Sequence, residues 1–134
     1  MVGDELVDGT AIGQLLSSEI HGHERGVVGV LRVVDADPDA GATEGGTFAY
    51  GIDIDPNGDD PTPVAEVYLH PDRVRIEFLD GIERAAEAAG SEGLRARPKA
   101  VEPPRTLVFV ENGAEVKRAL RVVRAAAEPL DASG

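Results

Sequence analysis

Apolar and polar residues alternate most regularly between residues 64 and 79, where the sequence reads VAEVYLHPDRVRIEFL. A period of two is typical of a β-strand with one buried face, and Pro71-Asp72 divides the stretch into the two arms of a β-hairpin. The register that follows pairs apolar residues on one face: Leu69 with Val74, Val67 with Ile76, and Ala65 with Phe78. A two-residue and a four-residue loop give the same pairs, so the register does not depend on the turn type.

The other face of this predicted hairpin is polar, and we expect it to contact water. Its pairs are His70 with Arg73, Tyr68 with Arg75, and Glu66 with Glu77. Two facing carboxylates raise the pKa of one of them, as in general acid-base sites. We prefer the other interpretation, a surface ladder of charges in which Arg75, diagonal to Glu66, neutralises the repulsion. The candidate polar face therefore comprises Glu66, Tyr68, His70, Arg75 and Glu77.

Helical spacing of apolar residues occurs in three other stretches. The first helix has Asp8 or Thr10 as its N-cap and Gly22 as its stop, and the second is capped by Asp80. The third follows Asn112 and Glu115 as an N-terminal capping arrangement, and Pro129 is expected to end it. The inward-facing residues are Ile12, Leu15, Leu16 and Ile20, then Ile82, Ala85, Ala86 and Ala89, then Val116, Ala119, Leu120, Val123 and Ala127.

Four further segments complete the predicted sheet. Residues 27–35 are apolar on both sides except for Arg32 and suit a strand well inside the sheet, as do residues 106–110. Residues 47–54 alternate, and Pro98 confines residues 94–100 to an edge. The element order predicts an α+β fold: a single domain over residues 1–134, with a mainly antiparallel sheet of four to six strands and about three helices packed on one face.

The charge balance of the chain indicates the environment in which the protein works. The chain carries 25 acidic and 13 basic residues, a net charge of −12. Such self-repulsion is screened when the Debye length falls to about 3 Å at molar salt, so the composition favours a halophilic protein. The 42% hydrophobic content argues against disorder, and the absence of Cys excludes disulfides and thiolate chemistry. Because the start is acidic and no apolar run is long enough for a span, we expect a cytoplasmic protein without membrane contact.

The basic residues are concentrated in one segment. Residues 94–124 hold eight basic and three acidic side chains, a net charge of +5, whereas residues 1–93 have a net charge of −15. The candidate partner-binding residues are Arg95, Arg97, Lys99, Lys117, Arg118, Arg121 and Arg124. Nucleic-acid affinity from six to eight phosphate contacts would fall by about five to seven orders of magnitude per tenfold rise in salt. An acidic protein surface, including another copy of this chain, is therefore the preferred partner. The alternative for residues 95–99 is charge that deters edge pairing.

Two stretches resemble metal-binding patterns in part. Residues 53–58, DIDPNG, fit the first half of a calcium loop, but Val64 occupies the twelfth position, where a Glu is needed. A β-turn without a metal explains the residues from Asp53 to Asn57 equally well. His21 and His23, beside Glu19 and Glu24, could ligate zinc, and a solvated helix end is the alternative. We expect no resident metal and no cofactor.

The segments VVDADPD, AEVYLHPDRVRIEFLDG and PPRTLVFVENGAEVKRA resemble a family of small, uncharacterised acidic proteins of halophilic archaea. The resemblance implies a single domain and a salt-rich setting, and it carries over no catalytic residue. We therefore expect a non-enzymatic binding module that acts as a homodimer or through a protein partner. A nucleic-acid-binding protein using residues 94–124, or a small enzyme using the polar face of the hairpin, remains the alternative.

Overall fold

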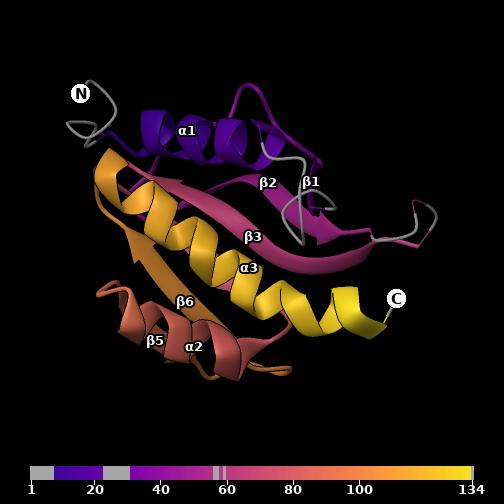
Figure 1. Cartoon of the computed structure of the whole chain (residues 1–134). Helices are drawn as coiled ribbons and strands as arrows, with labels where there is room; N and C mark the ends of the chain where they lie inside the picture. Colours follow the sequence, from indigo (N-terminus) through magenta and orange to yellow (C-terminus); the bar gives the residue numbers. More distant parts are fainter. Residues whose placement is uncertain (1–7, 23–30, 56–57, 59, 134) are drawn as a thin grey trace.

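A six-stranded antiparallel sheet carries three helices on one of its faces in the computed structural model of this protein (Figure 1). The structure describes residues 8–22, 31–55, 58 and 60–133. The elements are α1 (Gly9–Gly22), β1 (Leu31–Val34), β2 (Thr47–Ile54), β3 (Thr62–His70), β4 (Arg73–Phe78), α2 (Ile82–Ser91), β5 (Arg95–Lys99), β6 (Arg105–Val110), the 3-10 turn η3 (Gly113–Glu115) and α3 (Val116–Ser133). The predicted α+β single domain is confirmed.

The order of strands across the sheet is β1-β2-β3-β4-β6-β5. The β3–β4 hairpin lies at its centre, and all six of its predicted residue pairs are present, joined by the two-residue loop Pro71-Asp72. Placement of β6 inside the sheet and of β5 at its edge also agrees with prediction. The interior position predicted for residues 27–35 is wrong, because β1 is an edge strand. Val33 and Val34, which point to opposite faces of this strand, are both partly exposed. Residues 27–30 of that prediction lie outside the described residues.

The hydrophobic core lies between the sheet and the helices. Val67, Ile76 and Val108 are completely buried on the side of the sheet that the helices cover. The predicted inner residues of α1 and α3 join the same cluster, whereas Ala86 of α2 is exposed. The opposite side of the sheet carries no helix among the elements that the structure describes (Figure 1). We call that side the open face.

The helix ends follow the sequence in two cases and depart from it in two. Asp8 caps α1 by accepting hydrogen bonds from the amides of Thr10 and Ala11, and Asn112 caps the turn before α3. Asp80 does not cap α2. Gly81 occupies the cap position with φ of 59°, and a Cβ there would lie 2.5 Å from the carbonyl oxygen of Ala126, so this close contact with α3 requires glycine.

Pro129 does not end α3, which continues to Ser133. Proline has no N–H group and so leaves the carbonyl of the residue four positions earlier, Ala125, without its helical donor. Arg84 of α2 donates to that carbonyl at 2.9 Å. A side chain from a neighbouring helix thus replaces the missing backbone bond, and local sequence around Pro129 gives no sign of it.

Candidate binding groove on the open face

The register of β4, β6 and β5 brings basic and aromatic side chains together on the open face. Phe109 of β6 lies opposite Arg75 on one side and Arg95 on the other. In the next row of the same face, Leu107 lies between Glu77 and Arg97. Alternation within each strand therefore places all the odd-numbered residues of β5, namely Arg95, Arg97 and Lys99, on this face.

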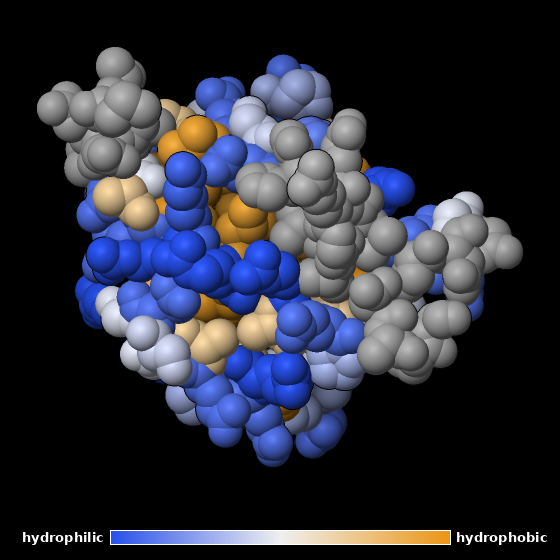
Figure 2. Space-filling model, in the orientation of Figure 1, coloured by the Kyte–Doolittle hydropathy of each residue, from blue (hydrophilic) through white to orange (hydrophobic). Residues whose placement is uncertain are grey.

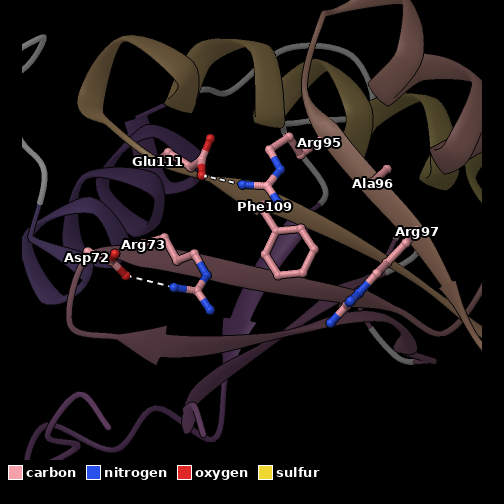
Figure 3. Close-up of a pocket in the computed structure, with 7 residues that line it drawn as sticks. All are labelled: Asp72, Arg73, Arg95, Ala96, Arg97, Phe109 and Glu111. Atoms are coloured by element: carbon pink, nitrogen blue, oxygen red, sulfur yellow. Dashed lines mark hydrogen bonds and ion pairs between the residues drawn. The ribbon is translucent and has the colours of Figure 1, made fainter. Parts of the chain in front are cut away.

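Phe109 is surrounded by three guanidinium groups (Figure 3). Their central carbons lie 5.9, 6.0 and 5.5 Å from the ring centroid for Arg73, Arg95 and Arg97 respectively. Figure 3 shows the ring between the side chains of Arg73 and Arg97. Cations at this distance are attracted to the negative face of an aromatic ring, so the ring holds the arginines over the sheet. The arginines in turn leave only 9% of Phe109 exposed.

Two adjoining cavities, of about 430 and 550 Å³, lie over these residues. Arg73, Arg97 and Phe109 line both, so the cavities form one depression, which we call the groove. Asp72, Arg95 and Glu111 border one end, and Arg75, Glu77 and Lys99 border the other. The walls of the groove are mainly cationic.

Carboxylates of the same chain neutralise some of these cations. Asp72 accepts a hydrogen bond from Arg73 at 2.8 Å, and Glu111 accepts one from Arg95 at 3.1 Å. Arg97 is exposed and has no carboxylate within ion-pair distance in the described part of the chain. The groove and its ion-pair partners hold six cations and four carboxylates: Arg73, Arg75, Arg95, Arg97, Lys99 and Arg105 against Glu66, Asp72, Glu77 and Glu111. This region thus has excess positive charge in a chain of net charge −12.

Glu77 is the buried anion beneath the groove. Only 1% of the residue is exposed, and its carboxylate accepts hydrogen bonds from Arg75 at 2.8 Å, Arg105 at 2.9 Å and Lys99 at 3.1 Å. Burial alone would raise the pKa of this carboxyl, but the bonds from Lys99 and Arg105 and the charge of Arg75 hold the pKa below its usual value. Glu77 therefore does not have the raised pKa that an acid-base pair of facing carboxylates would need. Lys99 and Arg105, distant in sequence, supply charges that lower the pKa.

Arg75 neutralises part of the repulsion between Glu66 and Glu77, as predicted, but it does so by pairing with Glu77 at 2.8 Å, and Arg105 adds a second cation between the two carboxylates. Nη1 of Arg105 donates to both carboxylates at 2.9 Å. Glu66 also accepts a hydrogen bond from the Tyr68 hydroxyl at 2.7 Å, and burial together with this bond raises the pKa of Tyr68. Arg75 lies over the Tyr68 ring at 4.5 Å. Each polar group of the predicted enzyme face thus has a partner within the chain.

His70 is buried, with 3% of its surface exposed, so the expectation that the polar face contacts water is wrong at this residue. The loop before β2 covers it: Nδ1 of His70 lies 3.0 Å from the carbonyl oxygen of Glu44. Arg75 can only donate, and its Nη1 lies 2.9 Å from Nε2 of His70, so the ring is neutral and carries its proton on Nδ1. Burial and the charges of Arg73 and Arg75 lower the pKa of His70, against a smaller opposing effect of the Glu44 carbonyl.

The predicted partner-binding residues do not form one surface. Arg95, Arg97 and Lys99 lie on the open face, whereas Lys117, Arg118, Arg121 and Arg124 are exposed on the outer side of α3, beyond the helix-covered face. Figure 2 shows hydrophilic side chains gathered over α3 on that side. Nε of Arg121 is already 3.0 Å from a carboxylate oxygen of Glu92. The net charge of a segment gave no information about which face its residues occupy.

Sequence reasoning missed Arg73 and Phe109 as groove residues and Arg105 as the partner of Glu66 and Glu77. The signal was present for two of them. Residues 95–99 have cationic side chains at odd positions, and residues 105–109 have Arg105 and Phe109 at odd positions. Pairing of these two antiparallel strands places the odd-numbered residues of both on one face. Without the pairing of β4 with β6, however, no pattern places Arg73 next to Phe109.

In the described ranges, no three carboxylate or imidazole side chains are grouped so that they could hold a metal ion. The predicted calcium and zinc patterns include Asn57, His23 and Glu24, which lie outside those ranges. Burial and the neighbouring charges of Asp35 and Asp55 raise the pKa of Asp53. Both metal patterns remain sequence hypotheses.

A family model covers the chain from residue 1 to residue 134. The chain belongs to DUF7993, a family of unknown function. No curated protein and no solved structure matched this DUF7993 chain. Within the described part of this DUF7993 member, no helix is long and apolar enough to cross a membrane.

Proposed function

We propose that this DUF7993 protein is a non-enzymatic binding module that takes an acidic protein surface onto the groove of its open face. The observation that carries the proposal is Arg97, an exposed cation without a carboxylate partner in the described residues, held against Phe109 in a concave site. Arg is a frequent anchor residue in protein interfaces because its planar group forms bidentate bonds with carboxylates. The ring fixes this guanidinium in advance, which lowers the entropic cost of binding.

An enzymatic role has less support. A catalytic acid or base has to reach a substrate, but Glu77 is enclosed by three cations and His70 is enclosed by Glu44 and Arg75. The lowered pKa of Glu77 also makes this carboxylate a weak base. Hydrogen bonds inside the chain account for the polar groups beneath the groove, so we assign them a structural role.

A nucleic acid is the second candidate, because the groove is basic. Proteins that bind single strands stack bases on exposed aromatic rings, whereas Phe109 is 9% exposed and covered by arginines. Phosphate binding also weakens steeply with salt, and close Arg–carboxylate pairs are screened less. The charge balance of −12 supports a salt-rich cytoplasm as the working environment. These considerations favour an acidic protein.

Two charge reversals test the proposal. Arg97→Glu changes the groove, and Arg118→Glu makes the same change at an exposed position of α3, so both variants have the same net charge. Binding of a fluorescent oligoglutamate peptide and of oligo(dT) is measured by anisotropy at low and at molar KCl, and unfolding curves establish that both variants are folded. We expect Arg97→Glu to abolish peptide binding and Arg118→Glu to retain it.

Equal weakening in the two variants would mean that net charge, not the groove, attracts the peptide, and the proposal would fail. Tight oligo(dT) binding at molar salt that is lost in Arg97→Glu would replace the proposal with nucleic-acid recognition. Homodimerisation is the third outcome, measured by sedimentation of the wild type at molar salt. A dimer that Arg97→Glu dissociates would make the acidic partner a second copy of the chain.

A further inference from the structure

The three cations of β5 form a ladder along one wall of the groove. Arg95, Arg97 and Lys99 alternate with Ala96 and Pro98 and share the open face. Residues two apart on a strand are separated by about 6.6 to 6.8 Å, so the ladder spans about 13 Å. We infer that the groove recognises an extended acidic segment whose carboxylates stand at alternate positions and meet Arg95, Arg97 and Lys99 in turn. This inference rests on the proposed function and specifies its partner.

An extended chain matches the ladder with few ordered residues. Its side chains on one face repeat with the same period as those of β5, so acidic residues at positions i, i+2 and i+4 reach all three cations. A helix places i and i+4 about 6 Å apart, but it needs nine residues to reach three cations. Each additional ordered residue costs conformational entropy, which favours the extended segment.

The ladder cations are free to change partners. Arg97 has no carboxylate partner among the described side chains. The pair between Arg95 and Glu111 is exposed on both sides, and an exposed pair contributes little stability. Lys99 shares Glu77 with Arg75 and Arg105, so Glu77 keeps two cations when Lys99 turns to a ligand. An incoming carboxylate therefore leaves no buried charge without a partner.

The chain itself contains the complementary pattern, since Asp35, Asp37 and Asp39 alternate in the sequence DADPD. These residues are exposed, yet their backbone is not extended. Asp35 has φ of 53°, and the amide of Ala40 donates to the carbonyl of Asp37 to close a turn. The three carboxylates therefore do not repeat at strand spacing. We commit to a segment of another protein as the occupant and leave a second copy as an outcome of the test.

The test compares two peptides of identical length and composition. One alternates Glu and Ser, and the other gathers all its Glu residues in one half. We expect the alternating peptide to bind about five- to tenfold more tightly at molar KCl, the gain from two or three additional aligned ion pairs. Arg95→Ser should remove most of this preference. Glu111→Gln frees Arg95 from its internal partner and should strengthen binding of the alternating peptide about twofold or more.

The outcomes separate this inference from the proposed function. If both peptides bind equally and Arg97→Glu abolishes both, the groove binds acidic protein but spacing is not read, and only this inference fails. If Arg97→Glu changes the affinity for neither peptide, the proposed function fails as well. A wild-type dimer that Asp37→Arg and Arg97→Glu each dissociate, and that re-forms when the two variants are mixed, would overturn the inference in favour of a second copy.

Discussion

Glu77→Gln tests whether the buried carboxylate holds the open face together. The change keeps the shape of the side chain but removes the charge that three cations share at 2.8 to 3.1 Å. Removing one partner of a buried ion pair costs about 3 to 5 kcal/mol. Arg75, Arg105 and Lys99 retain 16%, 28% and 40% of their side-chain exposure and can turn toward water. We therefore expect a smaller loss, about 2 to 3 kcal/mol.

The assay is thermal unfolding at molar KCl, pH 7. With 134 residues and an unfolding entropy of about 2.1 cal/mol/K per residue, each kcal/mol lowers Tm by roughly 3 to 4 °C, so Glu77→Gln should lower Tm by roughly 7 to 10 °C. Glu66→Gln is the control, because this half-exposed carboxylate shares Arg105 and should lose about 1 kcal/mol or less.

The pH dependence of this difference provides a second check. The folded pKa of Glu77 lies below its usual value of 4.5, so the charged carboxylate stabilises the fold above about that pH. This contribution is lost as the pH falls through the folded pKa. The difference in Tm between the wild type and Glu77→Gln should therefore become smaller in that pH range. A Glu77→Gln variant as stable as the wild type at pH 7, or a gap that stays constant in acid, would refute the reasoning.

Three other predictions concern stability. In urea unfolding, Val67→Lys should lower the free energy of unfolding by several kcal/mol, because an unpaired ammonium would be buried. Tyr68→Lys, on the open face, should lower it by about 1 kcal/mol. Equal losses in the two variants would contradict the assignment of faces. The wild type should lose stability as the pH falls from 6.5 through the lowered folded pKa of His70, and His70→Gln should remove that slope from the pH profile of Tm. The Tm of the wild type should rise as KCl increases from about 0.1 M into the molar range, because salt screens the repulsion within a chain of net charge −12. A Tm that does not change with salt would contradict the halophilic interpretation.

The hairpin and the order of elements were predictable because each depends on local information. In 64–79 the alternation and the turn specify the register without any knowledge of neighbouring strands, and all six pairs are present. The helix at Pro129 was not predictable. Its continuation depends on Arg84 of another helix, which replaces the bond that the proline removes.

The site was predictable only in part, for a related reason. Parity places Glu66, Tyr68 and Glu77 on one side of the hairpin, but their burial depends on Lys99 and Arg105, which arrive from β5 and β6. The same distant contacts hold the pKa of Glu77 below its usual value, although burial alone would raise it. For the basic residues, charge counted along 94–124 combined two surfaces that lie on opposite sides of the sheet. Periodicity within β5 and within α3, read separately, is the signal that distinguishes them.

The central claim is that the groove of the open face is the binding surface. Its most direct test is a titration with the alternating Glu-Ser peptide at molar KCl, followed by NMR spectra of the arginine side-chain Nε–H groups. We expect the signals of Arg95 and Arg97, on the wall of the groove, to shift with a single saturating affinity. The signals of Arg118 and Arg124, on the outer side of α3, should stay in place. Shifts confined to the arginines of α3, or equal shifts on both sides of the sheet, would contradict the account.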